Sequence, residues 1–170
     1  MENKKELRKK AKDIRKTLDI ERISKAIVAK IEKLELFQQA KNVMIFYPLE
    51  NEINLLDLLE HSEKNFYLPR TIGDDMMACP YKIGDKLSKG DFNVAVPTTD
   101  GINPEILDLI FVPALMVDKE NYRLGYGKGF YDRFLEKTNA KTIVPISEKL
   151  IVEKLPIEEH DKKVDYIISA

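Results

Sequence analysis

The stretch RLGYGKGFYD, residues 123–132, is the part of the chain whose residue types could most clearly do chemistry. Its three glycines alternate with larger residues, and glycine lets a backbone take positive φ angles and approach a ligand closely. Arg123 and Lys128 add two cations, and the helical pattern that follows offers N–H groups that favour anions. Asp132 supplies a carboxylate of the kind that holds Mg²⁺ beside phosphates. The stretch therefore predicts either a polyphosphate cradle or a plain glycine-rich turn before a helix.

This stretch differs from the two commonest phosphate-binding patterns. The P-loop sequence G-x-x-x-x-G-K-[ST] is absent, and the glycine spacing is not the G-x-G-x-x-G of dinucleotide-binding folds. The stretch also lies late in the chain rather than after the first strand. Spacing alone therefore leaves both interpretations open.

The N-terminus carries a second group of cations. Residues 1–16 hold eight basic and three acidic side chains, although the whole chain has a formal net charge of only -1. Lys4, Arg8 and Arg15 recur at helical spacing beside an apolar stripe, so they border a face that should dock on the rest of the protein. Three interpretations remain open here: a solvated helix face, a weak nucleic-acid or membrane patch, and a phosphate-binding arm.

Composition limits the classes of protein to consider. A chain of 170 residues can bury one sizeable core, so we expect a single domain over residues 1–170. The only cysteine, Cys79, rules out a disulfide framework. The polar start MENKKELRKK has no apolar segment typical of a signal peptide, and no run is long enough to span a membrane. We expect a cytoplasmic protein that works as a monomer.

Short apolar runs and helical patterns indicate an α/β fold. Strands are expected at 43–47, 65–68, 107–112, 141–144 and 164–168, and an edge strand or hairpin at 76–81 and 92–96. Helices are expected at 3–18, 20–35, 53–61 and 129–137. Such alternation predicts a mainly parallel sheet with helices on both faces, in a single-domain three-layer sandwich.

Four of the strand runs stop at a proline, namely at Pro48, Pro69, Pro113 and Pro145. Proline cannot donate to a strand ladder, so it should end a central strand. In a parallel sheet these ends meet at the carboxyl edge, outside which ligands of open α/β sheets bind. We therefore expect the segments after these prolines, including a long irregular one at 114–128, to form the functional edge.

Four segments together resemble a known enzyme family. RLGYGKGFYDRFL closely resembles the signature of the 5-formyltetrahydrofolate cyclo-ligases, also called methenyltetrahydrofolate synthetases. Lys4–Arg8 is similar to the family's N-terminal K-x-x-L-R, Tyr47–Ile53 to its folate-contacting segment, and Leu155–Asp165 to its closing P-x-x-x-x-D-x-x-V-D. The resemblance covers essentially the whole chain in order.

The resemblance implies a Rossmann-like α/β enzyme that converts 5-formyltetrahydrofolate, with or without a polyglutamate tail, to 5,10-methenyltetrahydrofolate with hydrolysis of ATP. It implies transfer of the γ-phosphoryl group to the formyl oxygen, followed by attack of N10. Lys128, Arg123 and Tyr131 would serve this transfer. The ATP-binding residues that it implies are Lys4, Arg8, Arg123, Leu124, Gly125, Tyr126, Gly127, Lys128, Gly129, Phe130 and Tyr131.

The resemblance also implies a metal site and a folate pocket. Asp132 and Asp161 would hold Mg²⁺, and Tyr47 and Glu52 would line the folate pocket, with Glu52 placed to bond the pterin. The basic helix 3–18 would dock at the ATP site. No side-chain nucleophile is required.

Some positions depart from the family pattern, mostly on the folate side. Val96-Pro97 stands where the family commonly has Glu-Pro, Phe130 and Tyr47 replace other common residues, and the chain has no tryptophan. Two other functions therefore stay in view. One is a related ATP-dependent α/β enzyme for a different formyl or acyl substrate, and the other is a non-catalytic nucleotide- or RNA-binding module. We expect no nucleic-acid partner, because aromatic residues are not interleaved with the basic run.

Overall fold

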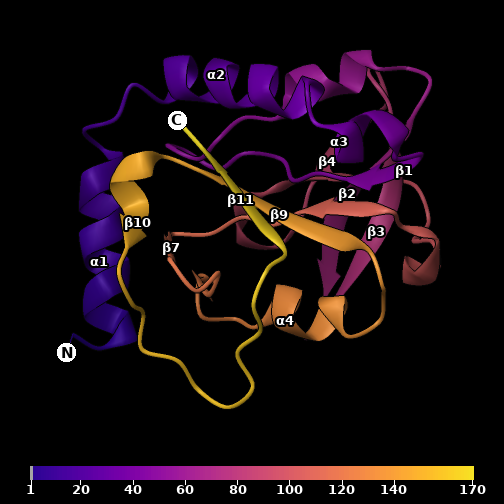
Figure 1. Ribbon diagram of the computed structural model, residues 1–170. Coiled ribbons are helices and arrows are strands. Elements are labelled where there is room, and N and C mark those ends of the chain that lie inside the picture. The colour runs from indigo at the N-terminus through magenta and orange to yellow at the C-terminus, as the bar shows by residue number, and fades with distance from the viewer. Residues whose placement is uncertain (1) are drawn as a thin grey trace.

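The computed structural model describes residues 2–170 and is built around one six-stranded sheet (Figure 1). The strand order is β11-β9-β6-β1-β2-β3, and all neighbours are parallel except β2 and β3. The strands are β1 (Asn42–Met44), β2 (Asn65–Ile72), β3 (Asp75–Tyr81), β6 (Leu109–Phe111), β9 (Lys141–Ile146) and β11 (Tyr166–Ser169). The five strands expected in the main sheet and the edge strand at 76–81 are confirmed, with β11 and β3 at the two edges.

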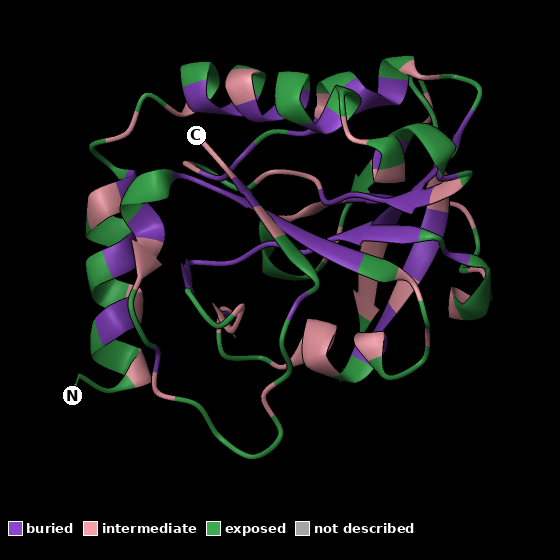
Figure 2. Cartoon of the chain, viewed as in Figure 1, coloured by how far each residue is buried: buried purple, intermediate pink, exposed green. Residues whose placement is uncertain are grey.

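Helices cover both faces of this sheet, so the predicted three-layer α/β sandwich is confirmed (Figure 1). The α-helices are α1 (Lys4–Arg15), α2 (Ile20–Glu32), α3 (Glu35–Gln39) and α4 (Phe130–Leu135). Helices α2 and α3 pack on one face, and α1 and α4 pack toward the other. Figure 2 shows their buried residues turned inward and their exposed residues turned to solvent.

The helix boundaries follow from capping side chains. Asn3 accepts a hydrogen bond from the backbone N–H of Glu6 and starts α1, and Asp19 accepts one from Arg22 and starts α2. A turn at 16–18 separates these helices, so the first expected helix, 3–18, is shorter than predicted. The expected helix 53–61 is wrong in type: only the 3₁₀-helix η1 (Leu56–Glu60) forms there.

Two of the four prolines do not end their strands, which corrects the sequence expectation. β2 continues through Pro69 and β9 through Pro145. At both positions the pairing with one neighbour has already stopped: β1 pairs with β2 only as far as Tyr67, and β6 with β9 only as far as Ile143. The missing N–H group therefore costs no ladder bond on that side.

The stretch 114–128, expected to be irregular, contains most of a second sheet. Its strand order is β10-β7-β8, formed by β7 (Met116–Asp118), β8 (Arg123–Leu124) and β10 (Ile151–Val152). The buried carboxylate of Asp118 accepts hydrogen bonds from the backbone N–H groups of Glu120, Tyr122 and Leu155. This small sheet anchors the start of the glycine-rich loop, because β8 leads directly into it.

The segment 92–96, expected as an edge strand or hairpin, is a strand only at its end. Asp91–Asn93 is the 3₁₀-helix η2, in which Phe92 and Asn93 have φ angles of 59° and 60°. β5 (Ala95–Pro97) follows and pairs with β4 (Leu87–Lys89) in a separate hairpin. Two further 3₁₀-helices are η3 (Pro104–Ile106) and η4 (Glu148–Leu150).

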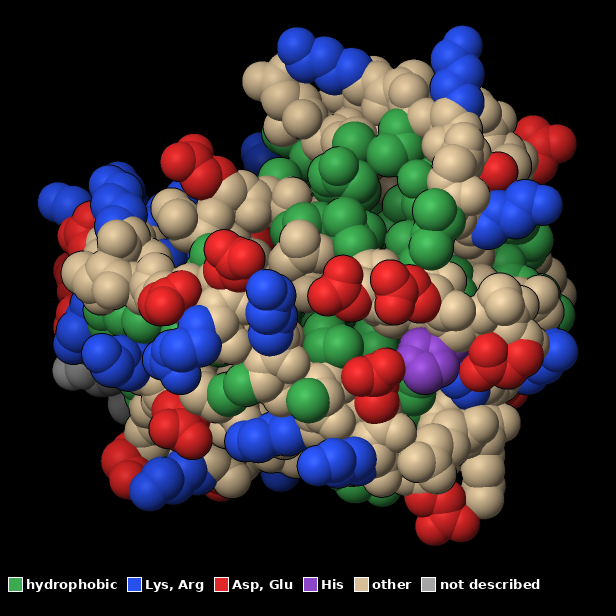
Figure 3. Space-filling model, turned by 90° about the horizontal axis from the view of Figure 1, so that it is seen from above, with side chains coloured by type: hydrophobic (Ala, Val, Ile, Leu, Met, Phe, Trp, Pro, Cys, Tyr) green, Lys and Arg blue, Asp and Glu red, His purple; other side chains and the backbone are tan. Residues whose placement is uncertain are grey.

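The surface on the α2 side mixes both signs of charge, and a group of hydrophobic side chains lies in its upper centre with smaller ones elsewhere (Figure 3). This even mixture agrees with the near-zero net charge of the chain. Across residues 2–170 we find no helix with both the length and the apolar character needed to cross a membrane.

Candidate active site

A cavity of about 640 Å³ opens at the carboxyl edge of the central sheet, within the size range of ligand sites. Its walls come from the segments after β1 and β6, from β2, from η2, from α1 and from the loop between β8 and α4. The structure brings every residue of the site expected from sequence to this cavity. They are Lys4, Arg8, Tyr47, Glu52, Arg123, Leu124, Gly125, Tyr126, Gly127, Lys128, Gly129, Phe130, Tyr131, Asp132 and Asp161.

The glycine-rich loop and α1 are in direct contact at one end of the cavity. Arg8 Nε donates a hydrogen bond to the carbonyl oxygen of Gly125, at 2.9 Å. Gly127 has a φ angle of 98°, and a Cβ atom added there would lie 3.3 Å from Cζ of Arg8. Only glycine allows this conformation and this close approach together. The loop therefore holds a cation against its own backbone.

Lys4 also reaches the cavity from α1. Its Nζ lies 2.7 Å from Oδ2 of Asp161 and 3.4 Å from Oε1 of Glu158. Burial alone would raise the pKa of Asp161, but the hydrogen bonds from Lys4 and from the Glu158 backbone outweigh it, so this pKa lies below its ordinary value. Asp161 is therefore an ionised carboxylate with a cationic partner.

Arg123 is the most enclosed cation of the site. Its side chain is 7% exposed, donates to the carbonyl oxygen of Pro113 at 2.9 Å and lies 3.7 Å from Oδ1 of Asp132. Its guanidinium also lies over the Tyr131 ring, 5.5 Å from the centroid. Burial raises the pKa of Tyr131 far above its ordinary value, so this hydroxyl stays protonated. Arg123 thus links the loop, α4 and the end of β6.

Lys128, by contrast, is exposed at the cavity mouth. Its ammonium lies 5.6 Å from the ring centroid of Phe92, and Phe92 makes an edge contact with Phe130 at 6.3 Å. Sequence reasoning assigned no site role to Phe92. A lone aromatic residue in a short turn carries no local signal, and its place at the cavity depends on how two distant loops pack.

The other end of the cavity contains a buried carboxylate. Glu52 is 6% exposed; its Oε1 accepts a hydrogen bond from the Leu49 backbone at 3.0 Å, and its Oε2 accepts one from the Tyr126 hydroxyl at 2.5 Å. Burial raises the pKa of Glu52 above its ordinary value, although these hydrogen bonds and the charge of Arg15 oppose the rise. Burial likewise raises the pKa of Tyr126, so its hydroxyl remains a donor.

Apolar and aromatic side chains surround this end. They come from the segment after β1, from β3 and from the chain around β5, and are Phe46, Tyr47, Leu49, Met76, Val94 and Val96. A flat, partly apolar ligand with N–H donors at one edge would match this combination, because a buried carboxylate needs donors to compensate its desolvation.

The cavity offers few carboxylates that could bind a metal ion. Among residues 2–170 no three His, Cys, Asp or Glu side chains gather in positions suited to a metal ion. Asp132 and Asp161 both line the cavity. Mg²⁺ commonly takes one or two carboxylates and completes its shell with phosphate oxygens and water. This donor set therefore fits Mg²⁺ carried by a nucleotide better than a metal ion held by protein alone.

The three-layer fold, with its cationic glycine loop and apolar pocket at the carboxyl edge of the sheet, is that of an α/β enzyme. The family model described as the 5-formyltetrahydrofolate cyclo-ligase family matches residues 1–170. The chain belongs to this family.

Individual relatives agree with this membership. A 5-formyltetrahydrofolate cyclo-ligase of Haemophilus influenzae is 30% identical over 136 residues, which covers 73% of each chain. A mouse (Mus musculus) cyclo-ligase is 27% identical over 152 residues, covering 78% of this chain and 74% of the relative. The NMR structure of a 5,10-methenyltetrahydrofolate synthetase from Aquifex aeolicus superimposes with a TM-score of 0.88 at 31% identity, covering 98% of this chain and 89% of that one.

Proposed function

We propose that this enzyme converts 5-formyltetrahydrofolate to 5,10-methenyltetrahydrofolate and cleaves ATP to ADP and phosphate. The observation that supports this most is the shape of the site: one cavity joins the cationic glycine loop to the pocket of Glu52. A triphosphate at the first end and a folate at the second would meet inside the same cavity. Membership of the cyclo-ligase family supports the same reaction.

The reaction must activate an unreactive formamide, because the N5 lone pair is delocalised into the carbonyl group. In the proposed route the formyl oxygen attacks the γ-phosphorus of ATP and ADP leaves. N10 then attacks the activated carbon and loses its proton, and phosphate leaves with the formyl oxygen. Phosphoryl transfer of this kind requires chiefly alignment and charge neutralisation from the protein.

The cations of the loop and of α1 would supply that neutralisation. Lys128 is exposed at the mouth and free to follow the γ-phosphoryl group, whereas Arg8 and Arg123 are held by backbone carbonyl oxygens. Lys4 would exchange Asp161 for a phosphate oxygen. The protonated Tyr131, stacked under Arg123, would keep that guanidinium in place.

Mg²⁺ would be held by Asp132 and Asp161, each of which is paired with a cation, Arg123 and Lys4 respectively. When bound beside the triphosphate, Mg²⁺ would neutralise part of its charge. The two ion pairs are therefore expected to rearrange when a metal nucleotide enters.

The folate would occupy the apolar end. Tyr47 and Val96 would pack against its ring system, and the carboxylate of Glu52 would accept N–H groups from the edge of the pterin. Val96 lines this wall, so the wall presents an apolar surface to the ligand. The polyglutamate form of the substrate is compatible with an open cavity mouth.

An absorbance assay tests this function directly. Purified protein is mixed with ATP, Mg²⁺ and 5-formyltetrahydrofolate, and the absorbance of methenyltetrahydrofolate is followed against mixtures that lack ATP or Mg²⁺. Growth that requires both supports the proposal. ATP binding without absorbance growth points instead to another formyl or acyl substrate, and no ATP binding at all points to a non-catalytic module.

We further propose that the enzyme acts as a monomer in the cytoplasm, without nucleic acid or membrane. The mixed charges of the α2 face support the part of this proposal that concerns nucleic acid, since that face offers a polyanion no single-sign surface (Figure 3). Light scattering coupled to size exclusion should give a mass near 19.6 kDa, and a dimer mass would contradict the proposal.

A further inference from the structure

A chain of hydrogen bonds runs from α1 to the carboxylate of Glu52. Nη1 of Arg15 lies 2.7 Å from the Tyr126 hydroxyl, which lies 2.5 Å from Oε2 of Glu52. A guanidinium can only donate hydrogen bonds, so the oxygen of Tyr126 accepts one from Arg15. The hydroxyl hydrogen of Tyr126 is then donated to Glu52. The direction of the chain is thereby fixed by chemistry alone.

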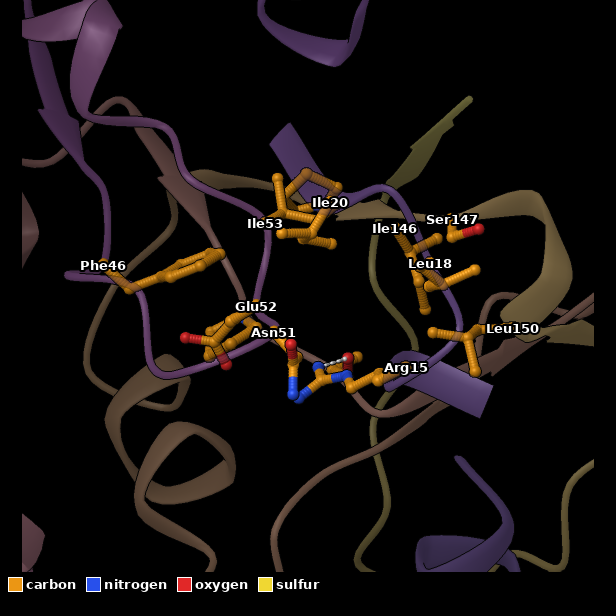
Figure 4. Close-up of a pocket in the computed structure, with 13 residues that line it drawn as sticks. Arg15, Leu18, Ile20, Phe46, Asn51, Glu52, Ile53, Ile146, Ser147 and Leu150 are labelled. Atoms are coloured by element: carbon orange, nitrogen blue, oxygen red, sulfur yellow. Dashed lines mark hydrogen bonds between the residues drawn. The ribbon is translucent and has the colours of Figure 1, made fainter. Parts of the chain in front are cut away.

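Arg15 cannot itself reach a ligand in the main cavity. It is 8% exposed, its Nη2 donates to the carbonyl oxygen of Ala114 at 2.9 Å, and it lines a crevice of about 10 Å³ behind Glu52. Figure 4 shows Arg15 in this crevice and the carboxyl group of Glu52 pointing away from Leu18 and Leu150. Arg15 can therefore act on a ligand only through Glu52, which it reaches by way of the Tyr126 hydroxyl and by its charge.

We propose that Arg15 is a positioning residue for Glu52 and acts through the Tyr126 hydroxyl. We call Arg15, Tyr126 and Glu52 the relay. Tyr126 donates a hydrogen bond to Oε2 of Glu52, and the Leu49 backbone N–H donates one to Oε1. Each oxygen keeps a second acceptor position for N–H donors of the ligand. Since the ligand of Glu52 is the folate, this inference rests on the proposed function.

The relay also sets the charge around Glu52. The titratable and charged groups that face it are Arg15 from α1, Tyr126 from the glycine-rich loop and Tyr131 from α4, while Arg123 from β8 acts on Tyr131. Of these, Arg15 is the cation that favours an ionised Glu52 against its burial. Without Arg15 the carboxyl group should hold its proton to higher pH and accept fewer hydrogen bonds.

Kinetics of three variants test the relay. Arg15→Met and Tyr126→Phe should each raise the KM for 5-formyltetrahydrofolate roughly tenfold. Arg15→Met should leave the KM for ATP within about twofold, and Tyr126→Phe, which alters the glycine-rich loop, should raise the KM for ATP by less than that for folate. The double variant should do no more than either single one, because both cut the same chain. Lys12→Met, exposed on α1, and Tyr166→Phe, exposed on β11, are matched controls that should change neither constant. Additive effects, or equal effects on both substrates, overturn the proposal.

A carboxyl titration by ¹³C NMR separates this proposal from the proposed function. The Glu52 midpoint should move to higher pH in Arg15→Met and move back toward that of the wild type in Arg15→Lys, which restores a cation. An unchanged midpoint in a folded Arg15→Met protein overturns the relay whether or not the wild type turns over folate. If Arg15→Met does not fold, Tyr126→Phe decides instead, because it removes the hydrogen bond that lowers the pKa of Glu52. An unchanged Glu52 midpoint in that variant overturns the relay. A wild type without turnover refutes the proposed function alone.

Discussion

The two ends of the cavity use their charges in opposite ways. At the phosphate end, Lys4 and Asp161 pair directly, and the pKa of Asp161 lies below its ordinary value. At the folate end, Glu52 is buried and bonded through a neutral hydroxyl, and its pKa lies above its ordinary value. Two opposing effects set each pKa, since burial raises it and hydrogen bonds and cations lower it. The lowering effect is larger at Asp161, and the raising effect of burial is larger at Glu52.

This contrast indicates two modes of binding. The phosphate end holds its charges in ion pairs that a nucleotide must exchange, so it should rearrange when it is loaded. The folate end is preorganised, because both oxygens of Glu52 are already fixed and only their remaining acceptor positions await a ligand. Changes at the first end should act on ATP binding and turnover, and changes at the second mainly on folate affinity.

The largest expected effect is that of Lys128→Ala. Loss of the exposed cation at the mouth should lower kcat on the order of 10²- to 10³-fold, as for removal of one group that stabilises transition-state charge. The melting temperature should stay close to that of the wild type, since the side chain is exposed. Stopped-flow turnover and a thermal melt check this. Near-normal turnover would remove Lys128 from the site.

Glu52→Ala should come second. The KM for folate is expected to rise about 10- to 100-fold, because hydrogen bonds to a charged group contribute about 1.5–3 kcal/mol. The KM for ATP should change little. Steady-state kinetics with each substrate varied in turn measure the split. Equal changes in both constants would mean that the two ends are not separate.

Gly127→Ala should have a moderate effect on the phosphate end. A side chain at this φ angle and close to Arg8 should strain the loop, and the KM for ATP should rise roughly three- to tenfold. Gly73→Ala is the matched control: its φ angle of 61° is also positive, but no atom lies within 4 Å of the added Cβ. That variant should lose stability only. A raised KM for ATP in the control would show that loop strain is not specific to the site.

Stability should depend on pH with opposite signs at the two carboxylates. The folded protein holds the Glu52 proton more tightly than the unfolded chain, so this contribution to the free energy of unfolding falls as pH rises above 4.5 and through the folded pKa. The Asp161 contribution is present above 3.8 and is lost as pH falls through its lower folded pKa. Urea titrations across this pH range measure the free energy of unfolding of wild type, Glu52→Gln and Asp161→Asn. The difference between wild type and each variant gives the pH-dependent contribution of that carboxylate. Slopes of the same sign would contradict the contrast.

The smallest effect should come from the outer face of α1. Lys5→Met and Lys9→Met remove cations that are exposed and do not line the cavity, so both KM values should stay within about twofold at fixed ionic strength. Titration of ATP into these variants and into Arg8→Met makes the comparison. A loss of ATP affinity in the lysine variants as large as that in Arg8→Met would show that net charge, rather than position, matters.

The sequence predicted the layers and the cavity edge because both depend on local patterns. The β-rich runs and the helical spacing are readable within short windows, and Gly127 and Gly129 need the positive φ angles that their residue type suggests. The site residues that the family resemblance implied all line one cavity in the structure. Their individual roles stay predictions.

What the sequence could not reveal depends on contacts between distant segments. Strands β7, β8 and β10 are two or three residues long, so they carry no periodic signal. Strands β2 and β9 pass through prolines because a neighbouring strand has already stopped pairing, which only the register shows. Arg15 stood out as a basic residue beside a docking face, but its link to Tyr126 spans 111 positions of the chain.

Transfer of an oxygen isotope is the most direct test that the two ends meet in one reaction. The substrate carries ¹⁸O in its formyl group, and the phosphate released during turnover with unlabelled ATP is analysed by mass spectrometry. The proposed mechanism predicts one ¹⁸O atom in each phosphate released, because the formyl oxygen attacks the γ-phosphorus and leaves with it. Unlabelled phosphate from a productive turnover would contradict it, since the formyl oxygen would then never have joined the γ-phosphoryl group.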